Sequence, residues 1–112
     1  MSGHLERVQD WVSLAQTARY RVEDLAALCS VSRRQLERQF AKRLGTPPHA
    51  WLNDLRLGRA CELLLHGYYV KAAALEVGFR DASHFCRAFK LRYGVTPRAF
   101  VAQQAKKVAF RK

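Results

Sequence analysis

The chain has 112 residues, 49% of them hydrophobic, which suffices for one small domain or for two very small ones that share a core. Twenty Lys and Arg residues against nine Asp and Glu give a formal net charge of +11, so the expected partner is a polyanion. A membrane surface would suit the same charge, but the sequence has no apolar run near the roughly 20 residues of a spanning helix and no signal-peptide pattern. We therefore expect a protein of the cytoplasm.

Cysteine and histidine are too scattered to indicate a metal site. The three cysteines are far apart and form no Cys-x-x-Cys pair, which favours reduced, mostly packed thiols. His84 and Cys86 are two residues apart on a predicted helix, so they point in different directions and do not suit a shared zinc ion. The sequence also has no Gly-rich phosphate loop, nucleophile elbow or catalytic carboxylate pair, so we expect no cofactor and no enzyme.

Helical periodicity accounts for the start of the chain. Apolar residues at helical spacing predict a helix over about 4–17 and a short one over about 22–29. Ser32 stands three residues before Gln35, a capping-box spacing in which each side chain can bond the other residue's backbone N–H. A third helix is therefore expected to begin directly after Ser32.

This third helix, over about 33–43, carries the first basic stretch. Leu36, Phe40 and Leu44 are spaced to face a core, and Gly45 is a typical helix end. The other side chains of the helix are then left on its outer side.

The longest predicted helix covers about 48–66, because proline is tolerated in a first helical turn. At 1.5 Å per residue it would be roughly 28 Å long and would act as a strut between the two halves of the chain. A break at 67–69 follows, Gly78 ends the next helix, and Asp81 caps the one after it. These last helices are expected over about 70–77, 82–93 and 97–104, followed by a loose basic tail at 106–112.

The chain contains an internal repeat. Val22–Leu52 can be laid over Val70–Val101 with one inserted residue, at an offset of 48 before the insertion and 49 after it, as between Arg38 and Arg87. Each copy consists of a short apolar helix, a tight turn and a basic helix closed by glycine, which is typical of a helix-turn-helix. A strongly basic protein with two such units is predicted to hold DNA in two adjacent places.

We therefore predict an all-α fold of seven helices, in which two helix-turn-helix subdomains are joined by a long central linker helix. No strand is expected. Within the single domain 1–112, the expected parts are a first subdomain at 1–52, the linker helix at 48–66, a second subdomain at 67–105 and the basic tail at 106–112.

Burial decides which side chains of the two basic helices are free to touch DNA. With its apolar stripe inward, the third helix leaves on its outer side Arg33, Arg34, Glu37 and Arg38. With Phe85 and Phe89 inward, the sixth helix leaves on its outer side Ala82, Ser83, His84, Cys86, Arg87 and Lys90.

Arg38 and Arg87 are the leading base-reading residues, because arginine presents two parallel donors to guanine O6 and N7 and the two occupy equivalent places in the repeat. The alternative is that such arginines only keep the surface charged. Two interpretations of Glu37 remain open: it accepts a hydrogen bond from cytosine N4, or it orients Arg34 or Arg38 through a helix-spaced ion pair.

Further basic residues suit the DNA backbone, where phosphate contacts add salt-dependent affinity without sequence information. For each of them an uninvolved, solvated charge is the alternative. The expected backbone contacts are Arg33, Lys42, Arg43, Lys71, Arg80, Lys90 and Arg92.

One long motif is specific to a family. The stretch from Gly78 to Lys90 (GFRDASHFCRAFK), continued by Tyr93–Pro97 (YGVTP), resembles the signature of the AraC/XylS family of bacterial transcription regulators. Leu55–Ala60 (LRLGRA) with Leu63 and Leu64 is similar to that family's central linker helix. The resemblance covers nearly the whole chain, from about Leu5 to Ala102.

The resemblance implies a two-subdomain DNA-binding domain whose recognition helices, about 33–43 and 82–93, enter successive major grooves on one face of the duplex. It also implies a cytoplasmic, nucleoid-associated protein that contacts RNA polymerase as an activator and is joined to a separate ligand-sensing or dimerising domain. Carried over by motif position, the base-contacting residues are Arg34, Glu37, Arg38, Ser83, His84 and Arg87.

Three positions depart from the family's pattern. Ser30 stands where glycine is frequent, so a left-handed conformation there would cost about 1 kcal/mol. Ala73 replaces a larger branched residue, which is expected to loosen the second unit. Cys86 replaces a small hydroxyl residue, which would leave an oxidisable thiol at the DNA face.

Two other classes of function fit the same charge. A non-specific, architectural or RNA-binding protein would bind nucleic acid without a large preference for one duplex, whereas a specific reader keeps a ratio of roughly 10³ or more. An adaptor whose basic helices dock on an acidic protein surface would show no competition by DNA.

Overall fold

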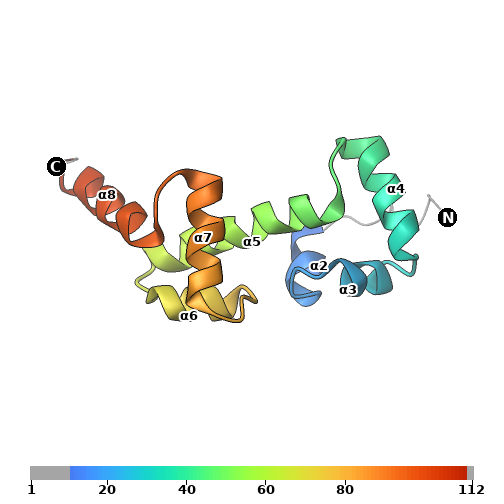
Figure 1. The fold of residues 1–112 in the computed structure, drawn as a ribbon, viewed down its shortest axis with the longest axis horizontal. Helices are drawn as coiled ribbons and strands as arrows, with labels where there is room; N and C mark the ends of the chain where they lie inside the picture. Colours follow the sequence, from blue (N-terminus) through green and yellow to red (C-terminus); the bar gives the residue numbers. More distant parts are fainter. Residues whose placement is uncertain (1–10, 111–112) are drawn as a thin grey trace. The chain divides into compact units, whose positions relative to one another are not determined.

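The computed structural model describes residues 11–110, with side chains for residues 11–105, and this part of the chain contains helices and no strand (Figure 1). The chain divides into two compact units: unit 1 ends at Arg56 and unit 2 begins at Leu57. No helix in the described part is long and apolar enough to cross a membrane. The helices are α2 (Trp11–Thr17), α3 (Val22–Leu28), α4 (Arg33–Leu44), α5 (Pro48–Leu65), α6 (Val70–Glu76), α7 (Ala82–Tyr93) and α8 (Pro97–Phe110).

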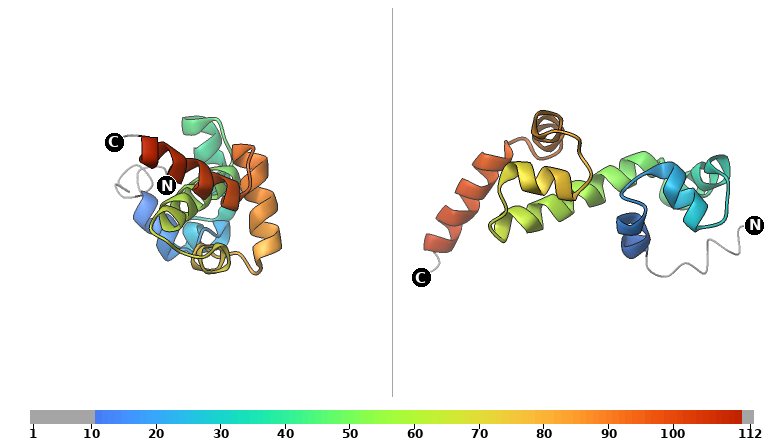
Figure 2. Two further views of the ribbon diagram at one scale, coloured as in Figure 1. Left: turned by 90° about the vertical axis from the view of Figure 1, so that its left-hand side faces the viewer. Right: turned by 90° about the horizontal axis from the view of Figure 1, so that it is seen from below.

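The core of unit 1 lies between α2, α3, α4 and the start of α5, and α3 contacts both α2 and α4 (Figure 2). Leu25, Leu36 and Leu52 are fully buried there. Aromatic rings close one side of this core, with Phe40 of α4 in edge-to-face contact with Trp11 at 5.6 Å and with Trp51 at 5.3 Å between ring centroids. The start of the first predicted helix, 4–10, falls outside the described residues.

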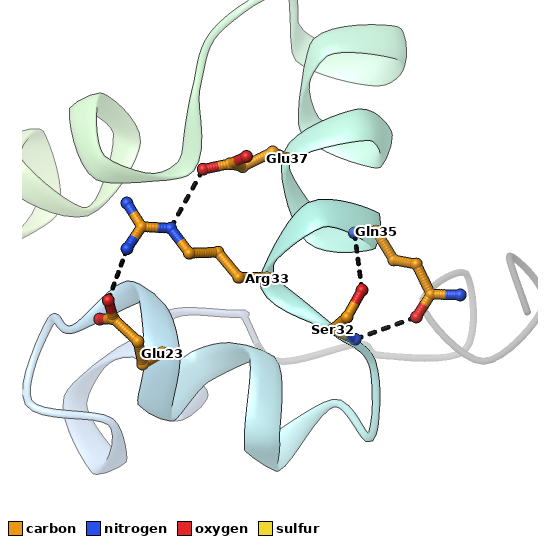
Figure 3. Close-up of polar contacts among 5 residues, drawn as sticks. All are labelled: Glu23, Ser32, Arg33, Gln35 and Glu37. Atoms are coloured by element: carbon orange, nitrogen blue, oxygen red, sulfur yellow. Dashed lines mark hydrogen bonds and ion pairs between the residues drawn. The ribbon is translucent and has the colours of Figure 1, made fainter.

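Helix α4 begins and ends where its caps predict. The Ser32 hydroxyl accepts from the backbone N–H of Gln35 at 3.1 Å, and the Gln35 side chain accepts from the Ser32 N–H at 2.9 Å (Figure 3). Gly45 ends the helix in the left-handed conformation, at φ 67°. Leu36 and Phe40 are buried as predicted, but the prediction for Leu44 is wrong, because its side chain is 56% exposed. Helical spacing alone does not show where the neighbouring helices stop.

Helix α5 is a single helix of 18 residues that belongs to both units (Figure 1). Leu52 packs in the core of unit 1, and Ala60, Leu63 and Leu64 are buried in unit 2. Leu57, at the start of unit 2, is also fully buried. The boundary between the units thus falls inside the predicted linker helix.

In unit 2, α7 contacts α6 and α8 (Figure 2). Phe85 and Phe89 of α7 are fully buried, and their rings continue a chain of aromatic contacts from Phe79 to Phe100. Ala73 is also fully buried, so a small side chain faces the core of unit 2 at this position.

The ends of α7 follow the sequence, whereas the end of α8 does not. Asp81 accepts from the backbone N–H of His84 at 2.8 Å and caps α7, and Gly94 ends it at φ 81°. Helix α8 continues to Phe110, so 106–110 are helical and the predicted loose tail at 106–112 is wrong for these residues. No glycine or proline interrupts the chain after Pro97, and alanine and lysine favour helix.

The backbone repeats together with the sequence. Among the described residues, four positions of unit 1 have positive φ, namely Arg19, Tyr20, Ser30 and Gly45, and three of unit 2 do. The three of unit 2 each match one of unit 1 at the offsets of 48 and 49 seen in the sequence. The matched pairs are Arg19 with Gly67, Ser30 with Gly78 and Gly45 with Gly94. The repeat therefore extends upstream of Val22, to the turn before α3 and before α6.

Candidate nucleic-acid interface

The outer face of α4 carries two arginines. Because Leu36 and Phe40 point into the core, Arg34 and Arg38 lie on the opposite side of the helix, one turn apart and exposed. Neither makes a hydrogen bond or an ion pair with any other described residue. Both guanidinium groups are thus available to a partner.

Glu37 is held by a different residue from those expected. Its Oε2 accepts a hydrogen bond from Nε of Arg33 at 3.1 Å, so neither Arg34 nor Arg38 is its ion-pair partner (Figure 3). Arg33 also donates through Nη1 to Glu23 of α3. The hydrogen bond to Glu37 and the charge of Glu23 raise the pKa of Arg33. Arg33, an expected phosphate contact, therefore already donates two of its five N–H groups to carboxylates, which offset its positive charge.

The outer face of α7 carries Ser83, His84 and Arg87, all exposed. Ser83 and Arg87 are one helical turn apart, as Arg34 and Arg38 are on α4. The His84 ring packs edge-on against Phe79 at 5.3 Å between centroids, which fixes one side of the imidazole. Arg87 makes no hydrogen bond or ion pair within the described residues.

Two predicted outer positions of α7 are not on its outer face. Ala82 and Cys86 are half-buried, and they line a groove on the flank of the helix, within unit 2. Helical geometry places them closer to the buried stripe than Ser83 and Arg87 are. The groove has a volume of about 810 Å³, and its lining includes Leu64, Tyr68, Lys71, Ala82, Cys86 and Pro97.

The predicted phosphate contacts fall into two groups. Lys42 follows Arg38 by four residues and Lys90 follows Arg87 by three, so each lies on the same side of its helix as the predicted base reader. Both are exposed, as are Lys71 and Arg80.

Arg43 and Arg92 lie elsewhere. They occupy matching positions in the last turns of α4 and α7, three residues after the buried Phe40 and Phe89. The Arg92 guanidinium lies 5.1 Å from the centre of the Tyr93 ring, a cation–π contact within unit 2. The structure therefore separates these two arginines from the predicted base readers.

Sequence reasoning missed two residues near the outer faces. Leu91 is 90% exposed and stands four residues after Arg87, and in the repeat it matches Lys42. Aligning the two copies of the repeat would have shown that an apolar residue in unit 2 replaces a cation of unit 1. Glu23 was missed because it stands ten residues before Arg33, a separation for which no helical spacing rule exists.

The three cysteines are free thiols. Cys29 is buried in unit 1, and burial raises the pKa of its thiol. Burial also raises the pKa of Cys61, against the opposing effect of a hydrogen bond with Tyr93. Among the described residues, no group of three or more His, Cys, Asp or Glu side chains could hold a metal ion.

Comparisons with known proteins agree with this geometry. A family profile described as a helix-turn-helix domain matches residues 25–103. The HTH-type transcriptional regulator MtrA of Neisseria gonorrhoeae is 38% identical over 79 residues, which cover 70% of this chain and 26% of that protein. The chain thus spans about a quarter of the length of the curated relatives it matches.

Solved structures extend the likeness to nearly the whole chain. A transcriptional regulator from Chromobacterium violaceum, described as an AraC-type DNA-binding domain-containing protein, is 34% identical with a TM-score of 0.77, covering 94% of this chain and 97% of that one. The DNA-binding domain of the global transcriptional factor AdpA, solved in complex with a target DNA, is 31% identical with a TM-score of 0.73, covering 86% and 90%. The chain belongs to the AraC/XylS family of transcription regulators, and it is a DNA-binding domain with the two helix-turn-helix units of that family.

Proposed function

We propose that α4 and α7 are the two recognition helices of this domain and that they enter adjacent major grooves of one DNA site. The observation that carries the proposal is the matched pair Arg38 and Arg87: both are exposed, both lie opposite a buried stripe, and neither has a partner among the described residues. Two parallel donors on each suit the O6 and N7 acceptors of guanine.

Around this pair we assign the remaining contacts by position. Base edges are read by Arg34, Arg38, Ser83, His84 and Arg87 on the outer faces of the two helices, and by Glu37 on the flank of α4. Backbone phosphates are contacted by the flanking exposed cations Lys42, Arg43, Lys71, Arg80, Lys90 and Arg92. Arg33, which the sequence also suggests, is left out of this set because its guanidinium is bound to Glu23 and Glu37.

The two half-elements of the site are expected to differ. Arg34 in unit 1 is matched by Ser83 in unit 2, and Glu37 is matched by Cys86, so the two helices present different groups to the bases. Recognition helices that bind successive grooves address half-elements about one helical turn apart, roughly 34 Å. A single domain would then bind an asymmetric site.

In the complete protein we propose a bacterial, cytoplasmic regulator that activates transcription through RNA polymerase. The length of the relatives supports a further domain, because this chain accounts for about a quarter of them. That domain would sense an effector or dimerise, and the domain described here would place it on the chromosome.

Selection of bound duplexes from a random pool, followed by affinity measurements on the selected site, tests the proposal. Arg38→Ala and Arg87→Ala are each expected to cost about 1 to 3 kcal/mol and to relax base preference in one half-element only. Lys42→Ala is the matched control: it should weaken binding equally on all sequences and reduce the salt dependence by about one counterion.

The same measurements separate the alternatives. Equal loss on every sequence for Arg38→Ala would reassign that arginine to a phosphate. A wild-type domain whose preference for the selected duplex over random DNA and RNA stays well below roughly 10³ at physiological salt would be a non-specific binder. Binding of an acidic protein without competition by DNA would indicate an adaptor.

A further inference from the structure

Glu37 is an unusual residue for a helix that faces DNA. Its side chain is 48% exposed and precedes the predicted base reader Arg38, on a helix that phosphates would approach. A free carboxylate there would repel the backbone. In the structure one oxygen, Oε2, is bonded to Arg33, and Oε1 makes no hydrogen bond to any other described residue.

Arg33 donates a hydrogen bond to each of two carboxylates. Its Nε donates to Glu37 in its own helix, and its Nη1 donates to Glu23 in α3 (Figure 3). Glu23 therefore anchors Arg33 to the preceding helix, and Arg33 in turn restricts the rotation of Glu37 and offsets part of its charge. Two carboxylates also leave this guanidinium less attractive to a phosphate than a free one.

We propose that Glu23 and Arg33 are positioning residues that hold Glu37 so that its free oxygen accepts a hydrogen bond from the exocyclic amine of a cytosine. This inference rests on the proposed function, because it requires α4 to enter a major groove. Cytosine N4 is the base-edge donor that suits a carboxylate acceptor in that groove. Arg33 then acts through Glu37 and does not itself contact the backbone.

Unit 2 is a natural control for this arrangement. The positions that match Glu23, Arg33 and Glu37 carry Lys71, Ala82 and Cys86, which cannot form the same bridge. They line the open groove on the flank of α7 instead. Cytosine preference of this origin is therefore expected in one half-element and not in the other.

The experiment measures base preference at each position of the selected duplex, as the ratio of affinities for the four bases. Glu37→Ala should lower the preference for one cytosine by about tenfold, the loss expected for a base-edge contact. Glu23→Gln and Arg33→Ala should lower the preference at that same position by about two- to fivefold, because exposed ion pairs are weak. Preferences at all other positions should stay unchanged.

Stability and a control variant make the result specific. The melting temperatures of the variants should stay within a few degrees of wild type, since the three residues are exposed. Cys86→Ala, at the position in unit 2 that matches Glu37, should leave the cytosine preference unchanged. A base-preference ratio is insensitive to losses that are uniform across sequences, so a merely structural role would not move it.

Three results would overturn the inference. If Arg33→Ala weakens binding equally on every sequence and reduces the salt dependence, Arg33 is a phosphate contact. If Glu37→Ala removes no preference while Arg38→Ala does, Glu37 does not read a base, although the proposed function stands. If the wild-type domain prefers no sequence, the inference and the proposed function fail together.

Discussion

In unit 1, ion pairs link the flank of α4 to the preceding helix α3, whereas in unit 2 the matching flank of α7 lines an open and mostly apolar groove. In unit 1 the bridge runs through Arg33 between two glutamates, and in unit 2 the same positions line a groove. The buried stripes are alike in both units, and each helix begins at a capping side chain and ends at a left-handed glycine, although only Ser32 forms a capping box. Within this chain the two units thus share their buried stripes and helix ends, while their flanks and outer faces differ.

The turns show a second contrast. Between the first two helices of the motif, unit 1 has Ser30 at φ 59° and unit 2 has Gly78 at φ 89°. The sequence predicted that Ser30 would be strained if it were left-handed, and the structure shows this conformation. The same contrast is seen upstream, where Arg19 of unit 1 has φ 55° and the matching residue of unit 2 is Gly67. Unit 1 therefore carries backbone strain that unit 2 avoids, at about 1 kcal/mol per site.

Core truncation gives the largest expected effect and tests how far the two units depend on each other. Phe85→Ala in unit 2 should lower the free energy of unfolding by about 3 to 5 kcal/mol, and Leu36→Ala in unit 1 by about 2 to 5, because both side chains are fully buried. Urea unfolding measures the loss, and hydrogen exchange shows which unit loses protection. Leu91→Ala is the control, with a change below about 0.5 kcal/mol. Losses below about 1 kcal/mol for both core variants would contradict the described packing.

Substitutions in the two turns should change the stability of the domain in opposite directions. Gly78→Ala is expected to destabilise the domain by about 1 to 2 kcal/mol, because a Cβ is strained at positive φ. Ser30→Gly should stabilise it by up to about 0.5 kcal/mol, since the relief of about 1 kcal/mol of strain is partly offset by the added freedom of the unfolded chain. Thermal unfolding of the two variants provides the test. Destabilisation by Ser30→Gly would show that the turn is not strained.

Removal of the N-caps of α4 and α7 should give the smallest difference in stability between the two units. Ser32→Ala and Asp81→Ala are each expected to cost about 1 kcal/mol, because each side chain accepts from a backbone N–H of the first helical turn. Asp81 is charged and so gains additionally from the helix dipole. Urea unfolding measures both losses. The loss for Asp81→Ala should exceed that for Ser32→Ala at low salt, and high salt should narrow this difference because it screens the charge. An unchanged midpoint for either variant would mean that its cap contributes nothing in solution.

Much of the fold could be predicted because the deciding interactions are local. The capping box of Ser32, the cap of Asp81 and the glycines after α4 and α7 set the helix ends within a few residues of sequence. The stripe of Phe85 and Phe89 follows from helical spacing. The prediction for Leu44 was wrong because its burial depends on where other helices end, and the predicted end of α8 was wrong because no helix-breaking residue marks it.

For the candidate site, the sequence likewise predicted the positions that depend on local spacing. Helical spacing identifies the outer positions of Arg34 and Arg38, and the repeat transfers the assignment to Arg87. The prediction was wrong at Cys86, which was placed on the outer side although its position directly after Phe85 puts it on the flank of α7, where it lines a groove. It also fails at the bond from Arg33 to Glu23, which depends on the contact between two helices. The base and phosphate contacts themselves stay predictions.

The unbroken α5 has a consequence for attempts to produce the two units as separate fragments. A cut at the boundary between Arg56 and Leu57 would divide the 18-residue helix into pieces of about nine residues, each shorter than the roughly 12 to 15 that hold together unaided. Each new end would also leave the backbone groups of a full turn without helical partners. A fragment of unit 1 should therefore end after Leu65, and a fragment of unit 2 should begin before Pro48, so that each keeps the entire helix.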